Sequence, residues 1–149
     1  MFYLPENAVL VALSQYNYVV DAVDTVAAKL ELVTRCSALQ INVISAMGSG
    51  NKLDPTAFVV TDLSKTQGCP LARVMRKELR KRGIVHLKVV YSPEEPLPPI
   101  QTAQIETPAG GETRPGSSAR RATPGSISFV PAAAGLVLAS AVIRDLGGF

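Results

Sequence analysis

Apolar and polar positions along this chain fall into two alternating patterns. Short runs rich in β-branched residues, typical of strands buried on both faces of a sheet, occupy residues 18–23, 41–46, 58–63 and 87–91. Longer stretches with apolar residues at helical spacing lie between them. The order strand–helix–strand predicts an α/β fold with a right-handed βαβ crossover.

Two long helices are predicted between these strands. The first begins at Asp24 or Thr25, either of which is a suitable capping residue, and runs to about residue 39. The second begins at Pro70, which suits the first turn of a helix, and stops at Gly83.

Residues 93–125 are crowded with Pro, Gly, Ser and Thr and hold few large apolar side chains. Such a segment cannot bury a core, so it predicts a disordered loop. Residues 1–92 and 126–149 are expected to form one domain around it. The first part also predicts a short helix capped by Asn7, and the last part a closing strand at 126–129 followed by an apolar helix.

That last helix, about residues 131–146, is apolar on all sides. A membrane span needs about 20 apolar residues, whereas this run contains Pro131 and ends at Arg144 and Asp145. We therefore expect a buried core helix and no membrane association. The first residues show no basic region followed by an apolar run, so no signal peptide is predicted.

The net charge of +3 is unevenly distributed. The predicted helix after Pro70 carries six bases against the single acid Glu78: Arg73, Arg76, Lys77, Arg80, Lys81 and Arg82. A charge run is usually a solvated face, but this one is too one-sided for a surface of salt bridges, which favours a polyanion such as RNA. Trp is absent and aromatic residues make up 5% of the chain, so aromatic stacking on bases is not predicted.

The two cysteines are far apart and do not form a CxxC pair, which favours a reducing cytoplasm. Cys36 lies within an amphipathic helix and is expected in the core. Cys69 precedes a helix N-terminus near Arg73, where the thiolate is favoured, so it is the candidate nucleophile. No histidine accompanies it, since His86, the only one, is expected to start a strand.

Asp21 and Asp24 follow the first predicted strand, and ligands of open α/β sheets bind beyond the carboxyl ends of strands. Either carboxylate can hold Mg²⁺ or polar nucleotide groups there, while helix capping is the simpler explanation of Asp24. Lys29 is open to two readings, a solvated helix residue or a phosphate contact. The turn at residues 48–52 is not a phosphate loop, because its spacing is too short and Leu53 replaces the hydroxyl residue.

Seven segments together carry a family resemblance. They are YVVDAVDT at 18–25, AK at 28–29, MGSGNKLDP at 47–55, KT at 65–66, CPLARVMRKELRKRG at 69–83, KVVYS at 88–92 and GSISFVP at 125–131. They resemble the ThiF/MoeB/HesA superfamily of ubiquitin-activating-type adenylating enzymes, and within it the tRNA threonylcarbamoyladenosine dehydratases. The resemblance covers nearly the whole chain except residues 93–124.

The resemblance implies a Rossmann-like domain with a mixed sheet flanked by helices. It also implies ATP- and Mg²⁺-dependent adenylation of a carboxylate in tRNA, followed by loss of AMP and ring closure. Asp24 matches the nucleotide- and metal-associated aspartate of the family, with Asp21 and Lys29 beside the nucleotide. Not all members have a cysteine at the position of Cys69, so an obligatory covalent role there is not implied.

One part of the family pattern is missing: no glycine-rich phosphate loop occurs in the sequence. The chain resembles only the C-terminal half of the family fold and lacks its N-terminal nucleotide-binding half. We therefore expect a truncated or split enzyme that alone neither binds ATP tightly nor catalyses the reaction. Expected partners are tRNA, a complementary N-terminal chain, a second copy in a homodimer, or a sulfur-transfer or ubiquitin-like protein. The alternative is a non-catalytic module that binds RNA or a partner.

Overall fold

The structure, a computed structural model, describes Tyr3, residues 5–98 and residues 125–149. Most of the predicted disordered loop therefore lies outside the described residues, and its described part, residues 93–98 and Gly125, contains no helix or strand. In chain order, the strands and helices are β1 (Tyr18–Asp21), α1 (Val26–Ala38), β2 (Asn42–Ala46), β3 (Val59–Asp62), α2 (Pro70–Arg80), β4 (Lys88–Tyr91) and α3 (Phe129–Gly147). Short 3₁₀ turns lie at Ala8–Leu10, Leu13–Gln15, Pro55–Ala57 and Leu63–Lys65.

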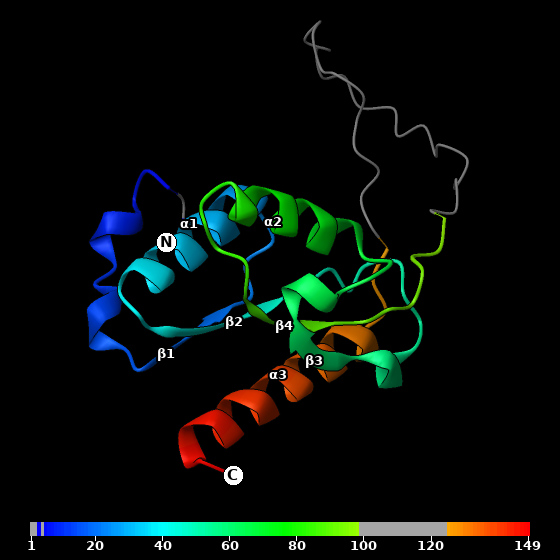
Figure 1. Cartoon of the computed structure of the whole chain (residues 1–149). Coiled ribbons are helices and arrows are strands. Elements are labelled where there is room, and N and C mark those ends of the chain that lie inside the picture. The colour runs from blue at the N-terminus through cyan, green and yellow to red at the C-terminus, as the bar shows by residue number, and fades with distance from the viewer. Residues whose placement is uncertain (1–2, 4, 99–124) are drawn as a thin grey trace, which may run out of the picture.

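The four strands form one mixed sheet in the order β1-β2-β4-β3. β1, β2 and β4 are parallel, and β3 pairs antiparallel with β4. Ile44 at the centre of β2 lies between Val20 of β1 and Lys88 of β4. Because the three parallel strands end at the same side, the carboxyl ends of β1, β2 and β4 form one edge of the sheet (Figure 1).

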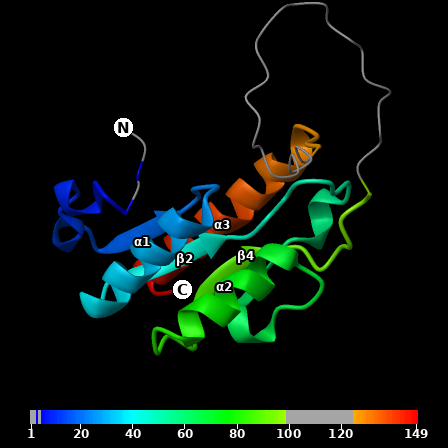
Figure 2. The ribbon, with the colours of Figure 1, turned by 90° about the horizontal axis from the view of Figure 1, so that it is seen from above.

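Two helical layers cover the sheet. α1 and α2 lie side by side over one face and α3 crosses the other (Figures 1 and 2). Leu30 and Val33 of α1 pack with Met75 and Leu79 of α2 and with Val89 of the sheet. On the opposite face, α3 buries four residues against Ile44, Phe58 and Val90, namely Val130, Ala134, Leu138 and Ala141. The predicted α/β architecture with a mixed sheet flanked by helices is thus confirmed.

The ends of α1 and α2 follow from local chemistry. Pro70 occupies the first turn of α2, where its missing N–H costs nothing, and Gly83 after the helix has a φ of +77°, which glycine adopts without strain. Thr25 occupies the N-cap position of α1, but its side chain makes no capping hydrogen bond. The capping explanation of Asp24 is therefore wrong.

Three boundary predictions are also wrong. β1 ends at Asp21, two residues earlier than expected. The region after Asn7 forms two 3₁₀ turns instead of an amphipathic helix. The Asn7 side chain makes no capping hydrogen bond, and Val9 is 78% exposed. Residues 126–129 form no strand, because Ser128 already has helical backbone angles and α3 starts at Phe129.

α3 is less buried than the sequence suggests. By length and composition alone, it is long and apolar enough to cross a membrane. Only 17% of its most apolar 18-residue stretch is buried inside the protein. Only the face that packs on the sheet is covered, while Leu136 and Ile143 are 73% and 60% exposed. The expectation of a buried core helix therefore holds for one face of α3 only.

Asp145 fastens the C-terminal part of α3 to the sheet. It accepts a hydrogen bond from the Tyr18 hydroxyl of β1 at 2.6 Å and pairs with the Lys88 ammonium of β4 at 2.6 Å. Both partners hold the pKa of the Asp145 carboxyl below its usual value, with the Lys88 hydrogen bond as the larger cause. One carboxylate thus connects the helix to the first residues of two parallel strands.

The packing of α3 generates a matched prediction. Leu138→Ala removes a side chain that is 7% exposed, so we expect it to lower the free energy of unfolding by about 2–5 kcal/mol. Leu136→Ala, the same change two residues away on the exposed face, is expected to change it by less than about 0.5 kcal/mol. Urea denaturation followed by circular dichroism measures both, and equal effects would show that α3 does not pack on the sheet by this face.

Candidate functional site

Side chains capable of binding or chemistry gather at the carboxyl edge of the parallel strands. β1 ends at Asp21 and continues to Asp24, and β2 ends at Ala46 before a glycine-bearing turn. β4 ends at Tyr91, next to Ser92. The N-terminus of α2 approaches the same edge, because a Cβ added at Gly48 would lie 4.0 Å from the Cβ of Leu71. This edge is where the fold class places its ligands.

A buried polar network holds the edge together. The Lys29 ammonium of α1 lies 3.2 Å from both carboxylate oxygens of Asp21 and donates to the Ala46 carbonyl at 2.7 Å. The Ser45 hydroxyl donates to Asp21 at 2.5 Å. Lys29 is 2% exposed, and Asp21 and Ser45 are fully buried. One network therefore joins β1, α1 and β2 at the point where two strands end.

The network decides what Asp21 and Lys29 can do. Burial lowers the pKa of the Lys29 ammonium, and the charge and hydrogen bonds of Asp21 oppose that effect. Both charges are already paired inside the protein, as buried charges must be. Asp21 and Lys29 therefore hold the edge together, and their predicted place beside a nucleotide stays a prediction.

Asp24 has the opposite environment. It is exposed, and its carboxylate accepts no hydrogen bond from another described residue. Its charge still raises the pKa of Lys29, which places it close to the buried network. Asp24 is therefore a carboxylate that remains available just beyond the end of β1.

A single carboxylate at this position fits Mg²⁺ in one particular way. Mg²⁺ is commonly held by one or two carboxylates together with the phosphates of a substrate. The described residues contain no group of three or more His, Cys, Asp or Glu side chains that could hold a metal by themselves. Asp24 therefore suits an ion that arrives with a nucleotide.

The turn after β2 is anchored to neighbouring segments. Lys52 is 3% exposed, its ammonium donates to the Ser92 carbonyl at 2.5 Å, and burial lowers its pKa. The backbone N–H groups of Leu53 and Asp54 donate to the Glu94 carboxylate at 2.9 and 3.1 Å. Lys52 is thus buried and connects two loops through its hydrogen bond. Its ammonium does not face solvent, where a phosphate would bind, which agrees with the absence of a phosphate-loop pattern in the sequence.

The structure gives both cysteines structural positions. Cys69 is 5% exposed and takes the N-cap position of α2, where its sulfur accepts a long hydrogen bond from the Ala72 N–H at 3.5 Å. This arrangement accounts for Cys69 without a catalytic step. Cys36 is fully buried, as predicted, and burial raises the pKa of its thiol to about 11. Neither cysteine is placed as an accessible nucleophile.

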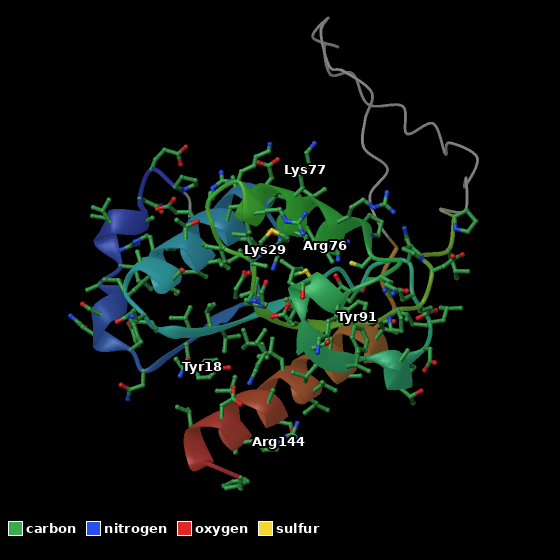
Figure 3. The ribbon with its side chains drawn as sticks, viewed as in Figure 1. Tyr18, Lys29, Arg76, Lys77, Tyr91 and Arg144 are labelled. Carbon is green, nitrogen blue, oxygen red and sulfur yellow. The ribbon has the colours of Figure 1, made fainter. Side chains whose placement is uncertain are left out.

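The six predicted RNA-binding cations, which lie on α2 and the two residues after it, fall into two groups. Arg76 is half-buried, and its guanidinium donates to the Leu63 and Thr66 carbonyls at 3.1 and 2.7 Å. Lys81 and Arg82 pair with the single acid, Glu78, at 2.7 and 3.5 Å. The second group is exposed, and its side chains make no hydrogen bond or ion pair with another described residue: Arg73, Lys77 and Arg80. Figure 3 shows Arg76 turned toward the loop before α2 and Lys77 directed away from the sheet.

Several residues that the sequence did not single out complete the picture. Ser45 and Ser92 are buried polar residues at the ends of strands, and Lys52 is buried in the turn after β2. Arg35 of α1 bonds the Val11 carbonyl at 2.9 Å and the Tyr3 hydroxyl at 3.2 Å, so it holds the N-terminal turns. A polar residue within an apolar strand, as with Ser45, was the one available signal. His86 is exposed and lies 3.3 Å from Asp62, outside any strand, so its predicted place in a strand is wrong.

The buried network makes a stability prediction. Lys29→Met leaves Asp21 as an unpaired buried charge, and we expect it to lower the free energy of unfolding by about 3–5 kcal/mol. The double variant D21N/K29M removes that charge and is expected to recover most of the loss. Lys77→Met, the same change at an exposed position, is the control and should cost less than about 0.5 kcal/mol. Chemical denaturation of the four proteins measures this, and a K29M variant as stable as the parent would refute the network.

Comparisons with known proteins agree with this geometry. A model of the ThiF family matches residues 3–149. The tRNA threonylcarbamoyladenosine dehydratase of Bacillus subtilis is 38% identical over 131 residues, which is 87% of this chain and 50% of the relative. The tRNA threonylcarbamoyladenosine dehydratase 2 of Saccharomyces cerevisiae is 43% identical over 83 residues, covering 55% of this chain and 19% of that protein.

Solved structures show the same likeness. The Escherichia coli tRNA N6-threonylcarbamoyladenosine dehydratase, solved in complex with ATP, superposes with a TM-score of 0.77 at 26% identity. The match covers 99% of this chain and 55% of that one. A second structure of the same enzyme, in complex with AMP, gives a TM-score of 0.76. The chain thus spans about half the length of the B. subtilis and E. coli proteins that it resembles.

Proposed function

Since this chain belongs to the ThiF family, we propose that it forms part of an ATP-dependent enzyme that dehydrates threonylcarbamoyladenosine in tRNA. The observation that carries the proposal is the exposed Asp24 at the carboxyl edge, in a fold that matches an ATP-bound dehydratase over 99% of this chain. The network of Asp21, Lys29 and Ser45 beneath Asp24 fixes the edge on which such chemistry depends.

The proposed reaction has two steps. A carboxylate oxygen of the modified base attacks the α-phosphorus of ATP, an acyl adenylate forms and pyrophosphate leaves. The carbamoyl nitrogen then attacks the activated carbonyl carbon, loses its proton and expels AMP, which closes a ring. The oxygen of the lost water leaves with AMP, so a poor leaving group becomes a good one.

Asp24 is the residue of this chain that we assign to the first step. When Mg²⁺ is bound, it supplies positive charge beside the phosphates. Asp24 suits this role because its carboxylate is exposed and is not used by another described residue. Asp21 and Lys29 act as positioning residues, since each is buried in the other's hydrogen bonds.

The rest of the nucleotide site must come from another segment. Adenylating folds of this type cradle phosphates on a glycine-rich loop and a helix N-terminus, and none of the 149 residues supplies that motif. We propose that the segment, in the same polypeptide or in a complementary chain, adds to the sheet beside β1. β1 is an edge strand that pairs only with β2 among the described strands.

Other expected partners receive unequal support. The exposed apolar face of α3, with Leu136 and Ile143, supports a second copy of the chain as a further partner. Cys36 and Cys69 are buried, which gives no support to a sulfur-transfer or ubiquitin-like partner. A cytoplasmic location stays a prediction.

The first test uses the chain as it exists. We expect isothermal titration with ATP and Mg²⁺ to show no micromolar binding by the isolated chain, because its described residues offer Asp24 but no phosphate cradle. Micromolar binding would contradict the divided nucleotide site and would place the phosphates on residues of this chain.

The second test measures the reaction. The chain is joined to the portion of the B. subtilis relative that has no counterpart in it, and tRNA carrying threonylcarbamoyladenosine is incubated with ATP and Mg²⁺. We expect mass spectrometry of the nucleosides to show loss of one water, and Asp24→Asn to reduce the rate by at least about 100-fold, comparable with the loss of one strong transition-state contact.

Glu6→Gln removes an exposed carboxylate away from the carboxyl edge and serves as the matched control, with an unchanged rate expected. A folded chimaera that leaves the modified base intact would refute the dehydratase proposal. It would favour the alternative, a module that binds RNA without catalysis, for which the basic face of α2 is the supporting observation.

A further inference from the structure

We propose that Arg73, Lys77 and Arg80 form a track for the phosphate backbone of the RNA substrate, running along α2 from the carboxyl edge of the sheet. The identity of the RNA as tRNA rests on the proposed function, whereas the polyanion chemistry rests on the surface itself. Five cations of α2 and its C-cap residue line a depression of about 460 Å³, and no acid lines it: Arg73, Arg76, Lys77, Arg80 and Lys81.

The three residues form one stripe. They are spaced i, i+4 and i+7, which places them on the same helical face, opposite the buried Ala72, Met75 and Leu79. With a rise of 1.5 Å per residue, the stripe is about 10 Å long. Lys77 is directed away from the sheet in Figure 3, as this spacing requires.

The stripe begins beside the proposed reaction site. The N-terminus of α2 is held against the carboxyl edge, since Gly48 after β2 faces Leu71 and a Cβ at Gly68 would meet the Pro93 carbonyl after β4. The helix then runs away from that edge, because the chain returns through residues 84–87 to the start of β4. An RNA whose modified base lies at the edge therefore has flanking phosphates within reach of Arg73 first and Arg80 last.

The remaining cations of α2 are committed to the protein. Arg76 supports the loop at Leu63 and Thr66, and Lys81 and Arg82 neutralise Glu78. The three stripe residues have no acidic partner among the described residues. Three of the six bases visible in the sequence are thus the ones whose side chains have no partner in the described part of the chain.

The chemistry of the stripe favours an RNA backbone. Arg and Lys donate to phosphate oxygens, and no aromatic residue on α2 offers a stacking surface for bases. An anionic membrane fits less well, because surface-bound helices combine basic residues with an exposed apolar face. Apart from Val74, which is 43% exposed, the apolar face of α2 is packed in the core, and the exposed apolar residues of α3 lie on the opposite face of the sheet (Figure 1).

The test measures how binding depends on salt. Fluorescence anisotropy of a labelled tRNA transcript is recorded with the full chain between 50 and 200 mM KCl. The triple variant R73Q/K77Q/R80Q removes three phosphate contacts, so we expect the slope of log K against log salt to fall by about 2 and binding at 0.1 M salt to weaken about 100-fold.

The matched control loses the same number of positive charges at positions outside the stripe. The variant K81Q/R82Q/R144Q removes the two cations paired with Glu78 and an exposed one on α3. We expect its slope to fall by less than about 1. Thermal unfolding of both variants verifies that each is folded, which is expected because all six side chains are exposed.

Three outcomes would overturn the track: equal slopes for the two variants, a parent slope near zero, or vesicles containing phosphatidylserine competing for the stripe more strongly than tRNA. None of these readouts involves ATP or ring closure. RNA binding through the stripe with an inactive chimaera would therefore reject the proposed dehydratase activity and retain the track, and the reverse result would reject the track alone.

Discussion

The ion pair between Lys29 and Asp21 is the interaction on which the arrangement of the carboxyl edge depends. It joins the last residue of β1 to the first half of α1, and through Ser45 and the Ala46 carbonyl it includes the end of β2. Removing two charges from water is costly unless both are fully paired and hydrogen-bonded. Because the polar groups of this network are hydrogen-bonded to one another, the two strand ends and the helix are held in one geometry.

This constraint separates two carboxylates that are only three residues apart. Asp21 is the last residue of the strand, and its carboxylate is hydrogen-bonded within the buried network. Asp24 lies beyond the strand and remains exposed. The first supplies rigidity and the second supplies an available charge on the same edge. A site built in this way needs few residues, because one buried pair fixes the backbone from which the exposed carboxylate projects. The same division recurs on α2, where Arg76 is used inside the protein and Lys77 faces outward.

The sequence was sufficient for the fold but not for the use of each charged residue. Apolar runs such as residues 41–46 and the helix start at Pro70 were correctly located, because burial on both faces and proline geometry leave direct marks in a sequence. The strand expected at 126–129 failed because Phe129 already belongs to a helix that packs through Val130. Lys29 was open to two interpretations, since its burial depends on Ser45 and Ala46, which lie 16 and 17 residues away. Tertiary contacts of this kind leave no local pattern.

The sheet also segregates the chemistry of the two surfaces. Its α2 side presents cations over a core that is already complete, and its α3 side presents an apolar helix whose outer face is uncovered. A polyanion and an apolar partner would therefore approach from opposite directions and need not compete. Asp24 and the ends of the parallel strands lie between these surfaces, at the edge that both can reach. If α3 is covered by another protein segment, that contact leaves the basic stripe open, so assembly and RNA binding are compatible in one complex.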